Sequence, residues 1–318
     1  MFIRFAVCAL LVLVSIEEAA AQEWQPNRPV HLTVGFSVGS TLDLMARAIA
    51  GPLGERLGQP VVVENKGGGN GRLALDLNAN AQPDGYTIHL TASGPLAIDP
   101  TLREAPLPGY QAVSQVAVGP MAIVVPSSLP ANSITELVAL AKNKPGELNY
   151  ASSGIGSTPH LAGELFASKA QVQLVHIPYK GNSDALGDML AGRVQILFSG
   201  LPPIMPMVEA GKLRVLAVQG TERSPNLPEV PPISEAGFPG AEAYSIYGLI
   251  APPGTEQQIL ARLSNAISGI VEMPSIKETF TRLGTRAVSS TPTEYAETIR
   301  HDTMKWSQVI KAAKISVK

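Results

Sequence analysis

The chain has 318 residues, of which 45% are hydrophobic and 16% charged, and its formal net charge is -2. This length and apolar content allow two domains of ordinary size, each with a buried core. The nearly balanced charge gives no basic surface for a nucleic acid, so no nucleic-acid partner is expected. The 29 glycines and 27 prolines are scattered, which is typical of many short loops between regular elements.

The first 21 residues have the pattern of a secretory signal peptide. Arg4 supplies a positive charge, residues 5–16 are almost all apolar, and Ala19 to Ala21 offer a cleavage site before Gln22. A bilayer span needs about 20 apolar residues, which makes a membrane anchor the weaker alternative. The one cysteine, Cys8, lies inside this segment. A mature chain without disulfides fits export to a bacterial periplasm.

Strand-like and helical segments alternate from residue 30 onward. The first half predicts strands at 30–34, 61–64 and 86–91 and helices at 41–57 and 72–81, and Gly51-Pro52 predicts a kink or break in the first helix. Two longer apolar stretches, 113–125 and 244–251, are extended in character.

The second half repeats the alternation. Ser133 and Glu136 form a capping-box pattern that opens a helix to about residue 144. Strands are predicted at 148–150, 173–177, 194–198 and 213–218, and helices at 158–168, 182–190, 256–271, 275–283 and from Thr291 onward. This order predicts an α/β fold with mainly parallel sheets and helices on both faces.

The two extended stretches are placed to carry the chain between two lobes. On that basis lobe 1 comprises residues 22–119 plus 246–318, and lobe 2 comprises residues 120–245.

Four predicted strands end in small, hydroxyl-rich loops, at residues 36–43, 91–95, 151–160 and 198–202. Ligands of open α/β sheets bind outside the carboxyl ends of strands, and free amides at a helix N-terminus favour an anion. Any one loop is also compatible with ordinary helix capping. For Asp43 the alternative is a helix cap, and for His160 it is simple packing. The candidate binding residues are Phe36, Ser37, Gly39, Ser40, Thr41, Asp43, Ser93, Gly94, Ser152, Ser153, Ser157, Thr158, His160, Tyr179, Ser199 and Tyr247.

The sequence offers little for catalysis, metals or cofactors. His160 and Glu164 are four residues apart on a predicted helix, but no third metal ligand lies nearby in the sequence. Gly67-x-Gly69-x-x-Arg72 breaks the dinucleotide pattern, and neither a phosphate loop nor a G-x-S-x-G elbow occurs. We therefore expect neither an enzyme nor a bound cofactor.

Eight motifs follow one another along the chain: R-P-V at 28–30, G-Q-P-V-V-V-E-N at 58–65, P-D-G-Y-T at 83–87, P-G-E-L-N-Y-A-S at 145–152, H-L-A-G-E-L-F at 160–166, I-P-Y-K-G at 177–181, A-G-K-L-R at 210–214 and E-A-G-F-P-G at 235–240. With these motifs in this order, the sequence from about Trp24 to Ala313 resembles the solute receptors of tripartite tricarboxylate transporters, the Bug family. The resemblance implies a type II-like, two-lobed Venus flytrap with a cleft between the lobes. It also implies a ligand carboxylate held by main-chain amides, hydroxyls and waters of the first loop and of the loop from Ser152 to His160.

Two positions depart from the family pattern. The first loop usually reads F-A-A-G-G-x-x-D, and here Ser40 replaces a glycine. The loop after strand 194–198 often reads D-N, and here it is Ser199-Gly200. Loss of an acidic side chain there suggests a ligand without an amine.

The resulting expectation is a monomeric periplasmic receptor that closes on a small organic carboxylate and delivers it to the membrane permease subunits of a tripartite transporter. Two alternatives stay open from the sequence: a carboxylate-binding module that signals to a sensor kinase, and a periplasmic enzyme acting on a carboxylate.

Overall fold

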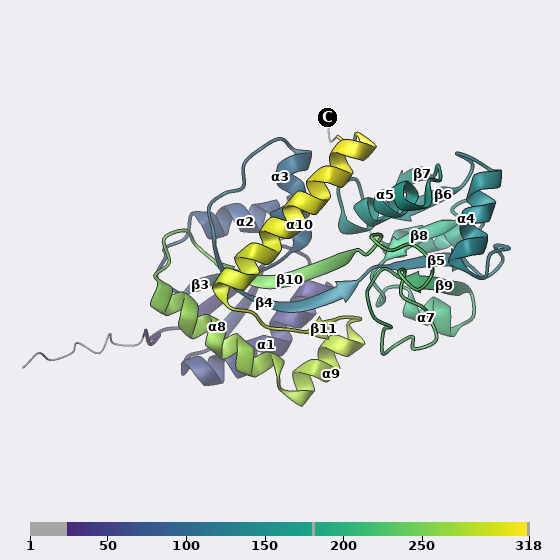
Figure 1. The fold of residues 1–318 in the computed structure, drawn as a ribbon. Coiled ribbons are helices and arrows are strands. Elements are labelled where there is room, and N and C mark those ends of the chain that lie inside the picture. Colours follow the sequence, from purple (N-terminus) through teal and green to yellow (C-terminus); the bar gives the residue numbers. More distant parts are fainter. Residues whose placement is uncertain (1–23, 180–181, 317–318) are drawn as a thin grey trace, which may run out of the picture.

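The computed structural model describes residues 24–179 and 182–316. The predicted signal peptide and Lys180-Gly181 of the I-P-Y-K-G motif lie outside these residues. Two sheets lie side by side, each covered by helices on both faces, so the chain forms a two-lobed α/β protein (Figure 1).

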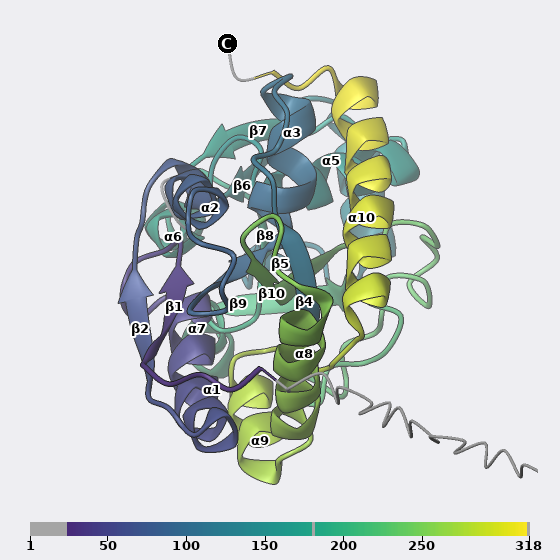
Figure 2. The same cartoon turned by 90° about the vertical axis from the view of Figure 1, so that its left-hand side faces the viewer.

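The first sheet has six strands in the order β11-β4-β10-β3-β1-β2. Its strands are β1 (Val30–Val34), β2 (Val61–Asn65), β3 (Thr87–Ala92), β4 (Gln111–Pro120), β10 (Tyr244–Ala251) and β11 (Arg286–Ala287). The helices α1 (Thr41–Leu57), α8 (Gln257–Val271) and α9 (Pro274–Arg282) pack on one face. The other face carries α2 (Arg72–Ala79), a π-helical turn (Gly94–Ile98), α3 (Asp99–Leu102) and the start of α10 (Pro292–Ala313), as Figure 2 shows.

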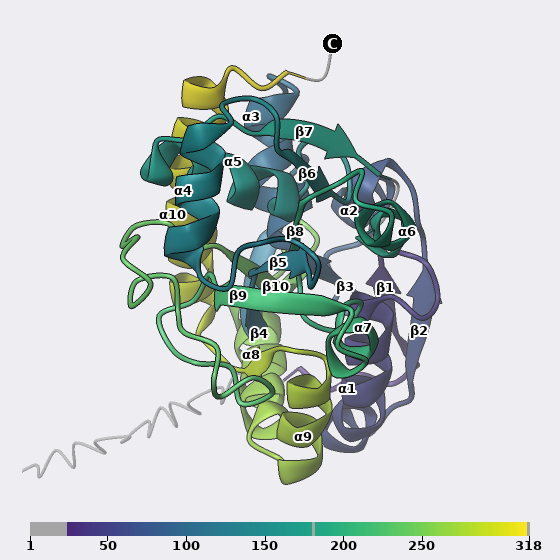
Figure 3. The ribbon, with the colours of Figure 1, turned by 90° about the vertical axis from the view of Figure 1, so that its right-hand side faces the viewer.

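The second sheet has five strands in the order β7-β6-β8-β5-β9. Its strands are β5 (Ala122–Pro126), β6 (Asn149–Ser152), β7 (Val175–Pro178), β8 (Ile196–Ser199) and β9 (Leu213–Val218). The helices α4 (Ile134–Asn143) and α5 (Thr158–Ala170) cover one face, and α6 (Leu186–Leu190) and α7 (Met205–Glu209) cover the other (Figure 3).

Both sheets are mixed, so the prediction of mainly parallel sheets was wrong in this respect. The pairs β1–β2, β1–β3, β6–β7 and β6–β8 are parallel, as the alternation of strands and helices predicts. The strands β4, β10, β5 and β9 pair antiparallel with their neighbours. The reason is that β4 runs into β5 through Met121 without an intervening helix, and β10 returns beside β4 in the opposite direction.

The chain passes from one sheet to the other at two places. Residue Met121 separates β4 of the first sheet from β5 of the second, and residues 219–243 separate β9 from β10. The segments meet there, because the Met121 amide donates to Ala243 O (2.9 Å) and the Gln219 amide donates to Met121 O (2.6 Å). The lobe boundaries at 119/120 and 245/246 stay a prediction.

The helix α1 runs without a break to Leu57, although Gly51 and Pro52 lie inside it. Its buried side includes Ile49 and Leu53, both fully covered, on either side of that dipeptide. Packing against the first sheet thus maintains the helix despite the missing amide of Pro52.

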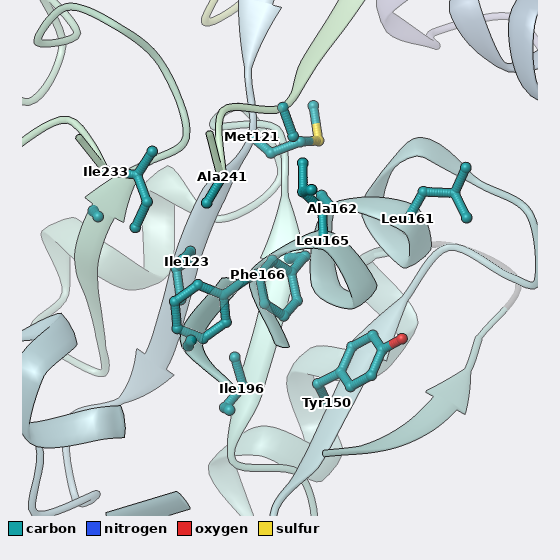
Figure 4. Packing of buried hydrophobic residues seen from close by; sticks show 14 of the residues in the cluster. Met121, Ile123, Tyr150, Leu161, Ala162, Leu165, Phe166, Ile196, Ile233 and Ala241 are labelled. Atoms are coloured by element: carbon teal, nitrogen blue, oxygen red, sulfur yellow. The ribbon is translucent and has the colours of Figure 1, made fainter. Parts of the chain in front are cut away.

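Alternate residues of the central strands enter different cores. In β5, Ile123 belongs to the core under α4 and α5, while Val124 belongs to the core under α6 and α7. The first of these cores also contains Tyr150, Phe166 and Ile196 (Figure 4). A substantial apolar interior therefore exists on both faces of the second sheet.

One glycine brings α5 close to this sheet. A Cβ atom on Gly163 would lie 2.5 Å from Tyr150 Cε2 and 3.0 Å from Phe198 Cδ2. Helix propensity favours alanine by about 1 kcal/mol, but overpacking two rigid rings costs about 1–3 kcal/mol. We expect Gly163→Ala to lower the free energy of unfolding by up to about 2 kcal/mol in urea denaturation. Gly51→Ala, on an exposed part of α1 with nothing within 4 Å, is the control and should be neutral or stabilising.

Candidate functional site

A cavity of about 270 Å³ lies between the two sheets, and its wall draws on both of them. Eight candidate residues line it: Phe36, Ser40, Thr41, Gly94, Ser153, Ser157, Thr158 and Tyr247. None of its lining residues carries a charged side chain. The groups that the cavity presents are therefore amides, hydroxyl groups, helix N-termini and apolar side chains.

The start of α1 forms one part of the wall. Ser40 is the N-cap, and its Oγ accepts the Asp43 amide at 3.3 Å. The first amides of a helix have no intrahelical acceptor. Since Ser40 satisfies only that of Asp43, the Thr41 and Leu42 amides have no acceptor within the helix at this wall, an arrangement that favours an anion.

Asp43 does not line the cavity; its carboxylate points back into the loop and is 1% exposed. It accepts the Gly39 amide (2.8 Å), Arg47 Nε (3.0 Å) and Asn65 Nδ2 (3.0 Å). Burial opposes ionisation, but the hydrogen bonds from Arg47, Gly39 and Asn65 outweigh it and lower the Asp43 pKa. A permanent carboxylate thus fixes the loop in front of α1.

The start of α5 contributes a matching element from the second sheet. Ser157 is the N-cap, and its Oγ accepts the His160 amide (3.3 Å) and donates to Gly154 O (2.7 Å). Pro159 in the first turn has no amide proton. The Thr158 amide is therefore the unused donor of this turn, at a residue that lines the cavity.

Two stacked histidines support this loop from behind. The rings of His160 and His176 lie 3.8 Å apart at 11°, and Tyr150 stacks on His176 at 4.9 Å. His160 Nδ1 accepts the Gly156 amide (3.0 Å), and His176 Nε2 lies 2.7 Å from Ser152 Oγ. Burial lowers the pKa of His160 to about 3, with a contribution from His176, and lowers that of His176 to about 4. Both rings are neutral near pH 7 and act through their hydrogen bonds.

The remaining candidates lie outside the cavity wall. Ser93 Oγ accepts the Ile246 amide (2.9 Å), and Ser199 Oγ donates to Gly200 O (2.7 Å). The Tyr179 hydroxyl donates to Asp188 Oδ2 (2.6 Å), and burial raises its pKa to about 12. Ser37 is exposed, and its carbonyl accepts the Ser40 amide (3.1 Å). With Gly39, Asp43, Ser152 and His160, these residues shape the loops behind the wall.

Sequence reasoning missed a second group of lining residues. They are mostly apolar or lack polar side chains: Asn70, Pro120, Met121, Pro202, Pro203, Leu283, Gly284 and Thr285. Two sequence signals pointed to this group, the predicted loop 198–202 and the extended stretch around Met121. No local pattern shows that these segments meet each other and the end of α9.

His160 Nε2 and Glu164 Oε1 are 3.9 Å apart. Within residues 24–179 and 182–316, no group of three or more His, Cys, Asp or Glu side chains is arranged to hold a metal ion. In the same part of the chain, no helix combines the length and apolar character needed to cross a bilayer.

Comparison with known proteins identifies the family to which this fold belongs. Residues 45–315 match the tripartite tricarboxylate transporter family receptor. Protein BugT of Bordetella pertussis is 33% identical over 291 residues, 90% of this chain and 89% of BugT.

Two solved structures of relatives contain carboxylates. Rpa4515 of R. palustris with adipate has a TM-score of 0.81 and 33% identity, covering 92% of this chain and 99% of that chain. MatC of Rhodopseudomonas palustris with bound malate has a TM-score of 0.77 and 27% identity, covering 90% and 99%. The family consists of periplasmic binding proteins, which are receptors and not enzymes. With the family match spanning most of its length, this two-lobed chain belongs to the tripartite tricarboxylate transporter receptors and is a solute-binding protein of the Bug family.

Proposed function

We propose that this protein captures a small organic carboxylate in the cavity between its lobes, closes on it by a hinge motion and delivers it to the permease of a tripartite transporter. One observation carries the proposal. The N-terminus of α1, which packs on the first sheet, and the N-terminus of α5, which packs on the second, line the same uncharged cavity. The adipate and malate held by two relatives have the chemistry that such donors suit.

The carboxylate is proposed to dock on the amides of Thr41 and Leu42 and on that of Thr158. A ligand bridging both helix starts would favour the closed arrangement, because only there do both sets of donors reach it. Charge-assisted hydrogen bonds contribute about 1.5–3 kcal/mol each, so three or four would support roughly micromolar binding after the costs of association.

The remaining parts of the proposal concern location and partners. Residues 1–21 are proposed to direct export to the periplasm, where the mature chain acts as a monomer. The permease subunits are separate chains that recognise the closed receptor. Capture of purified receptor by permease subunits, tested against a sensor-kinase ectodomain, decides between delivery and signalling.

A thermal-shift screen tests the carboxylate assignment. The mature protein is unfolded and refolded to remove any carried ligand, then mixed with mono-, di- and tricarboxylates, aromatic acids and amino acids. A ligand at about 100 times its Kd should add about 2.7 kcal/mol and raise Tm by roughly 5 °C. If well-folded protein gives a flat response to the whole panel, the carboxylate assignment fails.

A further inference from the structure

The wall of the cavity has two parts that differ in chemistry. One part holds the starts of α1 and α5 with their amides and hydroxyl groups. The other part, called here the hinge end, is formed by residues 119–121, Ser245, Pro202, Pro203 and residues 283–285. These last segments are contiguous, because a Cβ atom on Gly284 would lie 3.0 Å from both Leu201 Cβ and Pro202 Cδ.

The hinge end is poor in hydrogen-bond donors. Three of its residues are prolines, which lack an amide proton. The amides of Met121, Gly284 and Thr285 already donate to Ala243 O (2.9 Å), Thr281 O (2.8 Å) and Phe280 O (2.9 Å). The Thr285 hydroxyl also donates to Phe280 O (2.9 Å), and the Ser245 hydroxyl is hydrogen-bonded to the Tyr247 side chain. A second carboxylate at this end would leave water without a comparable set of donors to receive it.

The electrostatic potential at the hinge end also disfavours a second carboxylate. The helix α9 ends at Arg282, and the chain enters the cavity wall directly afterwards at Leu283. The C-terminus of a helix carries partial negative charge, which disfavours an anion. Since no Lys or Arg side chain lines the cavity, nothing charged offsets this effect. No Asp or Glu lines it either, so an ammonium group would also be unpaired.

We infer that the ligand is a monocarboxylate with an apolar body, its carboxylate at the helix starts and its hydrocarbon part against Met121, Leu283 and the prolines. This inference rests on the proposed function and narrows it to one class of acid. Burial of apolar ligand surface against these side chains supplies affinity that a second charge would forfeit.

Matched probes test the inference by isothermal titration of refolded protein. Straight-chain monocarboxylates of four to eight carbons are compared with the dicarboxylates and ω-amino acids of the same lengths, for example hexanoate, adipate and 6-aminohexanoate. The best monocarboxylate should bind at least about tenfold more tightly than the best of either other class. A smaller ratio, or a preference for the dicarboxylate or amino acid, overturns the inference but leaves a carboxylate receptor. Binding of no acid in this set or in the wider panel removes the proposed function as well.

A designed change of charge tests the location of the apolar end. Leu283→Lys places an ammonium group at the hinge end and should shift the hexanoate-to-adipate affinity ratio at least about tenfold toward adipate. Leu190→Lys adds the same charge at an exposed position of α6, outside the cavity wall, and should leave the ratio unchanged. A folded Leu283→Lys variant with the original ratio would contradict the assignment of this end to the apolar part of the ligand.

Discussion

Replacing Asp43 with alanine is expected to weaken ligand binding at least about tenfold and to lower the free energy of unfolding by about 2–3 kcal/mol. The change leaves the Gly39 amide without its acceptor, Asn65 Nδ2 with Phe36 O as its one remaining acceptor, and Arg47 without its carboxylate. The stability loss is held to this range because the Arg47 side chain is 50% exposed and water can solvate it. Binding suffers because the loop before α1 loses its anchor.

Calorimetry with the preferred acid and urea denaturation measure the two effects. Asp76→Ala is the matched control, since Asp76 pairs with Arg72 on the surface of α2 at 2.9 Å and its side chain is 48% exposed. That variant should change stability by no more than about 1 kcal/mol and leave affinity unchanged. If Asp43→Ala bound ligand as tightly as the original protein, the carboxylate would have no part in holding the loop.

Acidification from pH 6.5 to 5 is expected to lower the free energy of unfolding by about 4 kcal/mol. Burial holds the pKa of His89 at about 4, His160 at about 3 and His176 at about 4, all below the ordinary value near 6.5. A group whose pKa is depressed by folding keeps its full stability above the unfolded pKa and loses it as pH falls toward the folded one. The unfolded ring is only half protonated at pH 6.5, so each histidine costs about 1.6 kcal/mol in total between pH 6.5 and 5.

One carboxyl group opposes this trend. Burial raises the pKa of Asp302 to about 6, with the charged form partly favoured by Ser93, Lys305 and Trp306. Its neutral form is the one that folding prefers, so stability increases as pH falls through 6. A protonated His160 would also face Glu164, which lies 3.9 Å away. Both effects reduce the loss of stability on acidification but do not reverse it, because three histidines outweigh one carboxyl group.

Urea denaturation at both pH values checks this prediction. His160→Asn retains an acceptor for the Gly156 amide and should reduce the loss of stability between pH 6.5 and 5 by about one histidine's share, 1.6 kcal/mol. His301→Gln, at an exposed position on α10, should leave the slope as it was. An unchanged slope in the His160→Asn variant would mean that this ring is already charged or solvated in the folded state.

The order of elements was largely predictable from local patterns. The helix from Thr41 to Leu57, the strand from Leu213 to Val218 and the strand from Tyr244 to Ala251 have the predicted bounds. Periodicity and caps are local properties, and they survive in the fold because tertiary packing agrees with them. Strand direction is not local, which is why the antiparallel pairs of β4, β5, β9 and β10 were missed.

The site was predictable only where it is built from strand-to-helix loops. Ser40, Thr41, Ser157 and Thr158 were identifiable because hydroxyl groups before a helix have a recognisable pattern. The direction of the Asp43 side chain was not, since it depends on Asn65, a partner 22 residues away. The apolar hinge end was hidden for the same reason: Met121 and Leu283 meet only in the folded protein.

The helix α10 adds a mechanical constraint to any opening of the lobes. Tyr295 and Ile299 near its start pack with residues of the first sheet, whereas Trp306 and Ile310 are buried beside Leu165 and Phe166 on the second. At 1.5 Å per residue its 22 residues form a stiff rod of roughly 33 Å. The lobes are thus joined by the two segments of chain that pass between the sheets and also by α10, which packs against both. Opening the lobes widely would pull the indole of Trp306 from its apolar surroundings. The relative motion of the lobes that costs least is therefore a small rotation about the axis of α10.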